Sequence, residues 1–486
     1  MSSKLHLLTC VALGLACAPS SDKSSADFSV VASPSEGPLS GQTSIELALP
    51  ASILDEGVSG VWLGEADGTP LAVLDLEQAD AMVRFIDQGS PTAGPSTLTV
   101  ETHDDVHTFE GVYTHAAAVD PVFHRMAAVG ASLTQGVQGG VPTTQGLLSS
   151  PGALLARQSG GFLPLPLLVP DLFPSIGATD IGPAPACDVP GVTDFVTAAA
   201  MDVLGQLSDE DGVDLSLGRQ DPTLPAWHLA VGGSKVADVV DGPTASNFAA
   251  QFLSRLVYAP LVPLEDDLGP SQLERVVDVR PTLILTTDLA GNDVILPLTK
   301  PGPIDLSQLT PHEEVAAAAA EAIEVLASTG AVVLVATLPR PTLLPLSIDK
   351  KRRLIEEGAP ADEVQAVFES VDALTADNNA ALVTEAARWD NVHIVDLAAV
   401  TEGIHTDGVV VGDQRLYTVK LGGLISTDGV HFSNVGYAVT ANAFIDKINA
   451  VMGIEVPLVN LEEVASTDPY HPDALRAAGL DPSACD

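Results

Sequence analysis

The chain has 486 residues, enough for two domains or for one large domain with extensions. Hydrophobic residues make up 46% of it and aromatic residues 4%, which describes a folded protein rich in Ala, Val and Leu and excludes a largely disordered one. Its 64 acidic and 21 basic residues give a formal net charge of -43. Such an acidic surface repels nucleic acids and anionic membranes, so we expect no direct electrostatic binding to either.

The N-terminus has the pattern of an export signal. A lysine and a histidine precede an apolar run from Leu7 to Ala16, which is too short to span a bilayer. The run ends in "GLAC" and is similar to a bacterial lipoprotein signal, in which Cys17 would become the lipidated first residue. We therefore expect residues 1–17 to be a signal peptide, residues 18–27 a tether, and the protein an outer-membrane or cell-surface lipoprotein that touches the membrane only through its lipid. Periplasmic location or ordinary secretion is the alternative.

Two further cysteines, Cys187 and Cys485, lie beyond this signal. In an exported protein they could pair and hold the C-terminal tail against a loop in the middle of the chain. The sequence does not decide whether they come within bonding distance.

An acidic stretch, "SDEDGVDLS", places Asp209, Asp211 and Asp214 around Gly212. This arrangement is weakly similar to a calcium-binding loop, but its register does not match an EF-hand. A solvated acidic loop is the favoured interpretation, and we predict no metal site.

Short β-like segments separated by turn residues fill residues 28–118. Runs such as "TSIELALPA", "MVRFID" and "STLTVET" alternate or are apolar, with Gly, Pro, Ser and Asp between them. This spacing predicts a small β-sandwich. The stretches "SPSEGPLSGQTSIELAL" and "GSPTAGPSTLTVET" resemble immunoglobulin-like TIG/IPT modules, which implies a sandwich of the immunoglobulin type.

The pattern changes over residues 119–456, where apolar runs alternate with helix-like segments. The runs "RMAAVG", "AWHLAV", "PTLILTTDLA", "GAVVLVATLP" and "NVHIVDLAAV" are typical of buried parallel strands, and "TPHEEVAAAAAEAIEVLAST" is typical of a helix. The alternation predicts a three-layer α/β domain with a parallel sheet. Residues 141–225, rich in Gly and Pro, are expected to form an insertion in it, and residues 457–486 a C-terminal tail.

Polar and small residues follow these runs, at the strand ends where open α/β sheets bind ligands. Singly, each is ordinary turn or surface chemistry, but together they contain the groups that a hydrolase needs. They are Ser132 in "VGASLTQG", Gly232 and Gly233 in "LAVGGSKVAD", Asn292 in "LAGND", and Asp428 and His431 in "DGVH".

Acyl transfer requires a nucleophile, a base that takes its proton, a group that orients the base, and donors for the oxyanion. Ser132 supplies a hydroxyl, and His431 can accept its proton. Asp428 lies three positions before His431, close enough for its carboxylate to reach Nδ1–H. The N–H groups of Ser132 and Gly233 and the side-chain amide of Asn292 are suitable oxyanion donors.

The four blocks and their order resemble the SGNH/GDSL hydrolase family, the GDSL-like lipases and acylhydrolases, over roughly residues 125–452. The resemblance implies a flavodoxin-like three-layer domain. It also implies a serine esterase that works without a cofactor, through an acyl-enzyme and a triad of Ser132, His431 and Asp428. The family spacing favours Gly233 over Gly232 as the oxyanion donor. The expected substrate is a small-molecule or polymer-linked carboxylic ester.

One residue departs from the family pattern. Ala131 stands where the family usually carries an aspartate that supports the turn. A water molecule or Asp293 could take over that support. Two alternatives therefore stay open: a catalytically impaired surface binding protein on the same scaffold, and an esterase specific for acetyl groups on polysaccharides.

Overall fold

The computed structural model describes residues 30–66, 69–79, 82–170, 172–173, 199, 202–203, 206, 208–209, 212–213, 215–258 and 271–482. The predicted signal peptide and tether, Cys17, the pair Cys187 and Cys485, and the residues Asp211 and Asp214 of the acidic loop lie outside the described residues. The domain boundaries and the lipoprotein assignment accordingly stay predictions.

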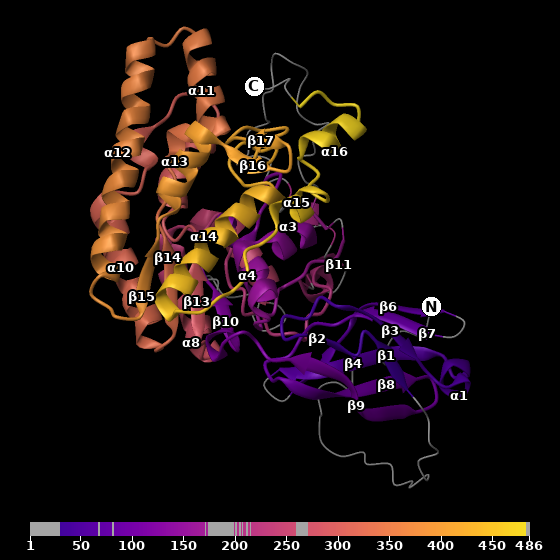
Figure 1. The fold of residues 1–486 in the computed structure, drawn as a ribbon. Helices are drawn as coiled ribbons and strands as arrows, with labels where there is room; N and C mark the ends of the chain where they lie inside the picture. The colour runs from indigo at the N-terminus through magenta and orange to yellow at the C-terminus, as the bar shows by residue number, and fades with distance from the viewer. Residues whose placement is uncertain are drawn as a thin grey trace.

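The N-terminal β region contains two sheets (Figure 1). Neighbouring strands are antiparallel except β2 and β9, which pair in parallel. The first sheet has the order β1 (Val31–Ser33), β3 (Ser44–Ala48), β7 (Met82–Ile86) and β6 (Leu74–Ala79). The second has the order β2 (Glu36–Pro38), β9 (Val106–Ala116), β8 (Gly94–Thr102), β4 (Val58–Ala66) and β5 (Thr69–Ala72), and α1 (Ala51–Asp55) follows β3.

The two sheets share one hydrophobic core. Alternate side chains of a strand point to the same face, and here each inward face is apolar. Ile45 and Phe85 from the first sheet pack in the same cluster as Leu63 and Leu98 from the second. The predicted sandwich is therefore confirmed, whereas the resemblance to TIG/IPT modules stays a prediction.

The second region is built on a parallel sheet whose order is β10 (Met126–Ala128), β13 (Leu283–Thr286), β14 (Val332–Ala336) and β15 (Val392–Val395). A parallel bridge between Ala128 and His228 adds the run "AWHLAV" beside β10. In chain order the sheet is thus arranged 2-1-3-4-5, the order of flavodoxin-like folds. The predicted α/β class and parallel sheet are confirmed.

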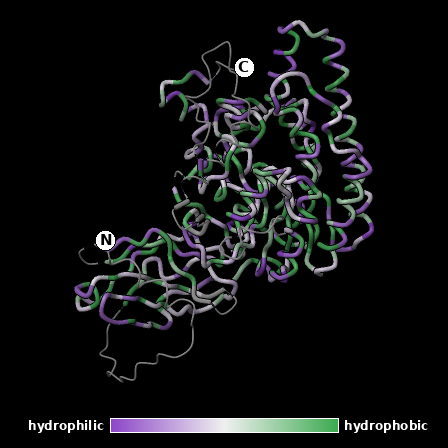
Figure 2. Tube along the Cα trace, turned by 180° about the vertical axis from the view of Figure 1, so that it is seen from behind, coloured by the Kyte–Doolittle hydropathy of each residue, from purple (hydrophilic) through white to green (hydrophobic). Residues whose placement is uncertain are grey.

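Two groups of helices cover the sheet. Helices α4 (Pro151–Ser159) and α14 (Asn434–Met452) pack on each other and against β10 and β15. Helices α6 (Val236–Asp241), α8 (Gln272–Val279), α10 (His312–Ser328) and α12 (Ala361–Ala386) form the other group, in which α10 contacts β14 and α12 contacts β15 (Figure 1). Seen from behind, hydrophobic residues gather in the interior of this region and hydrophilic residues along its outer helices (Figure 2).

Among the remaining elements, α11 pairs with α12 in a hairpin that projects beyond the sheet (Figure 1). The helices are α2 (Ser132–Gln135), α3 (Thr144–Ser149), α7 (Phe248–Tyr258), α9 (Asn292–Thr299), α11 (Pro345–Glu356), α13 (Leu397–Asp407), α15 (Leu461–Ala465) and α16 (Pro472–Ala477). The strands are β11 (Ser208–Asp209), β12 (Gly212–Val213), β16 (Val409–Val411) and β17 (Gln414–Leu416), and the 3-10 helices are η1 (Pro121–Phe123), η3 (Leu215–Gly218), η4 (Ala245–Asn247), η5 (Leu306–Gln308) and η6 (Pro341–Leu343).

One predicted strand was too long. The run "NVHIVDLAAV" leaves the sheet after Val395, because the Asp396 side chain accepts the Ala399 N–H and caps α13. Its last four residues are therefore helical rather than extended.

The β region is packed against the α/β region. Leu39, Leu71 and Leu74 belong to the hydrophobic core of the α/β region. The buried Gln88 Nε2 donates to Asp221 Oδ2 at 2.8 Å. Within the described ranges, no helix has both the length and the apolar character that crossing a membrane requires.

Candidate functional site

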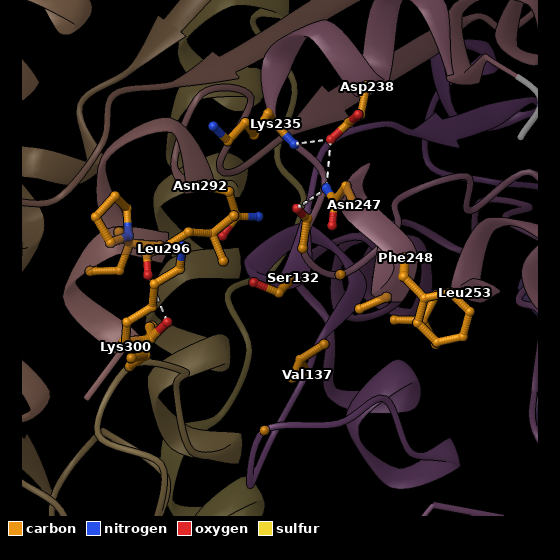
Figure 3. A pocket seen from close by; sticks show the side chains of 18 of the residues that line it. Ser132, Val137, Lys235, Asp238, Asn247, Phe248, Leu253, Asn292, Leu296 and Lys300 are labelled. Carbon is orange, nitrogen blue, oxygen red and sulfur yellow. Dashed lines mark hydrogen bonds between the residues drawn. The ribbon is translucent and has the colours of Figure 1, made fainter. Parts of the chain in front are cut away.

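A pocket of about 480 Å³ lies beyond the carboxyl ends of the sheet strands. Four of the predicted residues, Ser132, Gly233, Asn292 and His431, line it. In the close view, Lys235, Asp238 and Asn247 form a polar wall, and Val137, Phe248 and Leu253 form an apolar one (Figure 3). The structure thus brings together segments that are up to about 300 residues apart in the sequence.

Ser132 is the first residue of α2, directly after β10, and 8% of its surface is exposed. Three N–H groups around it donate to the carboxylate of Asp288. Ala131 N and Thr134 N lie 3.0 and 3.2 Å from Asp288 Oδ1, and Leu133 N lies 2.7 Å from Oδ2. The N–H of Ser132 itself has no acceptor among the described residues. It is therefore available to a ligand in the pocket.

The adjacent residues Gly232 and Gly233 differ in whether their N–H groups have an acceptor. Gly232 N–H donates to the buried Gln135 Oε1 at 2.8 Å, whereas Gly233 N–H meets no acceptor in the part of the chain that the structure describes. Gly233 has a φ of 83°, a left-handed conformation that favours glycine. Asn247 Nδ2 donates to the carbonyl oxygen of Gly233 at 3.0 Å. Gly233 therefore has the free donor that the family spacing favoured.

Asn292 opens α9 and is buried. One proton of its Nδ2 is donated to Ser234 O at 2.9 Å, which fixes the side-chain amide. A side-chain amide carries two N–H donors, so one stays available on the pocket side. Together with the N–H groups of Ser132 and Gly233, it makes three donors at one pocket.

The buried pair of Asp428 and His431 completes the site. Asp428 Oδ2 lies 2.9 Å from His431 Nδ1. The same oxygen accepts from Gly140 N at 2.7 Å and Ser426 Oγ at 3.0 Å. Oδ1 accepts the N–H groups of Val430 and His431, each at 2.8 Å.

These contacts decide the charge of Asp428. Burial acts to raise its pKa, but the charge of His431 and the hydrogen bonds from His431 and Val430 outweigh burial, so the pKa is lowered from 3.8. The carboxylate is therefore ionised near neutral pH and accepts the proton on His431 Nδ1. This leaves His431 Nε2 as the nitrogen that can take a proton from a substrate or nucleophile.

The prediction that Asp293 could replace the aspartate missing at Ala131 was wrong. Asp293 Oδ2 accepts Val236 N–H at 2.9 Å, and burial raises the pKa of Asp293. The turn is supported instead by Asp288, which sequence reasoning missed. Its signal was present, because the polar "TTD" directly follows the apolar part of β13.

The metal prediction for the acidic loop stays a prediction, because two of its three aspartates lie outside the described residues. Within the described residues, no group of three or more His, Cys, Asp and Glu side chains is placed to hold a metal ion. Of the three aspartates named above, Asp211 and Asp214 lie outside those residues.

Comparison with known proteins gives one family. Residues 126–444 match the model of the GDSL-like lipase/acylhydrolase family. No curated protein matches the chain. Among solved structures, amylomaltase from Corynebacterium glutamicum aligns with 63% of this chain and 55% of its own, at 12% identity and a TM-score of 0.12. This chain thus spans about half the length of that enzyme, and the TM-score is too low to indicate a shared fold. Because the family model covers more than half of the chain, the protein belongs to the GDSL-like lipase/acylhydrolase family.

Proposed function

We propose that the protein is a serine esterase that hydrolyses carboxylic esters through an acyl-enzyme on Ser132. One observation carries the proposal: Ser132, the N–H donors of Gly233 and Asn292, and His431 with its partner Asp428 behind it meet at one pocket. Membership of a family whose members are typically ester hydrolases supports it.

In the first half of the reaction, Ser132 Oγ attacks the carbonyl carbon of the ester while His431 Nε2 takes its proton. Asp428 keeps the other imidazole proton on Nδ1 and stabilises the imidazolium. The carbonyl oxygen becomes an oxyanion and accepts from Ser132 N–H, Gly233 N–H and Asn292 Nδ2. When the intermediate collapses, the C–O bond to the alcohol breaks and the alcohol leaves with the proton from His431.

In the second half, water attacks the acyl group on Ser132, with His431 again as the base. The same donors hold the second oxyanion. Its collapse releases the carboxylic acid and returns the proton to Ser132 Oγ. These steps balance without a cofactor or a metal ion.

A second cavity supports a preference for short acyl groups. This cavity of about 50 Å³ also touches Ser132 and Asn292, and its other walls include Leu133, Leu338 and Leu344. Its small volume suits a short acyl chain better than a long one. We place the acyl group there and the alcohol part in the larger, partly polar pocket.

We also propose export with lipidation of Cys17, on the N-terminal sequence pattern alone. The test is metabolic labelling with palmitate in a bacterial host. Wild type should take up label and Cys17→Ser should not. Equal labelling of both, or of neither, overturns this part.

The central experiment is labelling of the folded protein with a fluorophosphonate probe. We expect wild type to label and Ser132→Ala to lose both labelling and at least about 10⁴-fold of the turnover of p-nitrophenyl acetate. The chain offers a matched control, because Ser96 Oγ lies 2.6 Å from His115 Nδ1 and His115 Nε2 lies 3.0 Å from Asp87 Oδ2. This second serine–histidine–aspartate set is buried in the β region.

The control variant Ser96→Ala should keep labelling and turnover. If folded wild type takes no label and hydrolyses no ester, the alternative of an impaired binding protein on this scaffold is the better account. If Ser96→Ala abolishes labelling instead of Ser132→Ala, the site has been placed on the wrong residues.

A further inference from the structure

We propose that Asp288 positions the nucleophile Ser132. Asp288 follows a different strand from Ser132, and it supports the turn in place of the aspartate that the family usually carries at position 131. The inference rests on the proposed function, because it assigns a role within that catalytic site. It explains how a chain with Ala131 before the serine keeps a fixed nucleophile turn.

The hydrogen bonds that the Asp288 carboxylate accepts come from this turn. Asp288 is 3% exposed and follows β13, the strand next to β10. Besides the N–H groups of Ala131, Leu133 and Thr134, it accepts the hydroxyl of Thr134, whose Oγ1 lies 2.7 Å from Oδ1. All four donors come from the segment that contains Ser132.

The backbone before the serine is shaped around this carboxylate. Gly130 has a φ of 136°, and a Cβ there would lie 2.6 Å from Thr134 Oγ1 and 3.2 Å from Asp288 Oδ1. Glycine is therefore required both by conformation and by space. The buried Gln272 fixes the same residue from the other side, since its Oε1 accepts Gly130 N–H at 2.7 Å and its Nε2 donates to Gly130 O at 2.8 Å.

A further contact ties the turn to the sheet. Thr134 Oγ1 accepts the N–H of Thr287 at 2.9 Å while it donates to Asp288. Ser132 is thus the one residue from 130 to 134 whose N–H is left without an acceptor among the described residues. The carboxylate therefore does two things: it fixes where Ser132 lies, and it leaves the Ser132 N–H for the oxyanion.

Loss of the carboxylate leaves three buried N–H groups without their acceptor. The turn must then move to satisfy them, and a displacement of about 1 Å at a reacting atom lowers a rate by about 100-fold. Asp288 lies in the wall of the small cavity, but its carboxylate oxygens are engaged by the turn, so the loss should fall mainly on kcat and less on KM. The pH dependence of kcat should also stay unchanged, because the substitution removes no group that takes or gives a proton in the proposed reaction.

The test compares wild type with Asp288→Asn, Asp288→Ala and Thr134→Val. Rates of p-nitrophenyl acetate hydrolysis and fluorophosphonate labelling are measured per folded molecule, with folding checked by circular dichroism. We expect about a 100-fold fall in both rates for Asp288→Ala, and a smaller fall for Asp288→Asn, which keeps one oxygen acceptor. Thr134→Val removes one hydroxyl from the network and should lower both rates by about 10-fold. It keeps the inference testable if the Asp288 variants do not fold.

The matched control is Asp87→Asn in the β region, where another buried carboxylate accepts from a backbone N–H, that of Gly89. It should lower stability and leave the rate per folded molecule unchanged. Wild-type rates in folded Asp288→Asn and Thr134→Val overturn the inference, as does a shifted pH profile of kcat, which loss of a residue that only positions the turn would not cause. Absence of labelling in wild type is a different result, because it removes the esterase proposal itself.

Discussion

His431 Nδ1 lies 2.9 Å from Asp428 Oδ2, and the same carboxylate accepts hydrogen bonds from Gly140, Ser426, Val430 and the His431 N–H. Every direction from which the carboxylate could accept is thus occupied. The position of Asp428 and its ionised state are set by these neighbours before any substrate binds. The imidazole consequently holds its proton on Nδ1, which leaves Nε2 as the nitrogen that can act as a base.

Replacing Asp428 by asparagine should keep the fold and remove most of the activity. The asparagine oxygen can still accept from Val430 and His431, but its NH₂ group cannot accept the His431 Nδ1 proton. The proton then moves to Nε2, the wrong nitrogen, and kcat should fall by about 10⁴-fold. Steady-state kinetics on p-nitrophenyl acetate measure the effect.

The control for Asp428→Asn is Asp468→Asn. Asp468 is also buried, and its carboxylate accepts the N–H groups of Val435 and Tyr470. This variant should lose stability and keep kcat. A kcat for Asp428→Asn within tenfold of wild type would show that His431 is oriented by other means.

Asn292→Ala tests the oxyanion site. The substitution removes one of three proposed donors, and loss of one such donor lowers kcat by about 10²- to 10³-fold. KM should change little, because the charge on the oxygen develops only in the transition state. Asn391→Ala serves as the control, since Asn391 Nδ2 likewise holds backbone carbonyls, those of Ala327 and Ala331, but does not line the pocket. A fall seen in KM alone for Asn292→Ala would assign the residue to ground-state binding.

The small cavity predicts which esters react fastest. p-Nitrophenyl acetate should be preferred over the octanoate, because the small volume of the cavity beside Leu338 and Leu344 suits a short acyl chain better than a long one. Leu344→Ala should shift the preference toward butyrate or hexanoate by about 10-fold in relative kcat/KM, since each additional buried methylene contributes about 0.8 kcal/mol. Leu253→Ala enlarges the other pocket and is the matched control. If Leu253→Ala shifts the chain-length profile and Leu344→Ala does not, the acyl group occupies the larger pocket.

Much of this fold was predictable because its signals are local. Each buried parallel strand is a short apolar run, and the helix from His312 to Ser328 begins after Pro311 and is followed by Gly330 in a left-handed conformation, as its pattern indicates. That Ser132, Gly233 and Asn292 line one pocket was predictable for a related reason. Parallel strands end at one edge of a sheet, so residues that follow them in the sequence meet in space.

The features that the sequence did not reveal depend on contacts between distant segments. Asp288 meets the Ser132 turn across more than 150 residues, so although it follows the apolar part of β13, its place in the sequence does not show that this turn is its partner. The family spacing favoured Gly233 over Gly232, but the physical difference between them depends on a distant contact, because Gln135 accepts the Gly232 N–H. The overlong strand near Val395 is a different case, because the capping role of Asp396 is local and could have been recognised.

His228 gives the protein a predicted sensitivity to acid. It lies beside β10, is 0% exposed, and burial lowers its pKa from 6.5 to about 4, against a weaker opposing effect of the backbone at Thr134 and at His228 itself. Between these two values the unfolded chain binds a proton that the folded chain does not. Stability is therefore complete above about pH 6.5, falls as the pH drops toward 4, and levels off below that.

A pKa difference of this size corresponds to about 3 kcal/mol of unfolding free energy. Urea unfolding at pH 7 and at pH 4 gives the unfolding free energy that each protein loses between the two pH values. Wild type should lose about this much more than His228→Leu, in which the group cannot titrate. Comparing each variant with itself at the two pH values cancels the constant effect of the substitution on packing. His124→Leu, at a partly exposed histidine, should behave like wild type. If His228→Leu loses as much stability as wild type between the two pH values, acid sensitivity must come from the carboxylates instead.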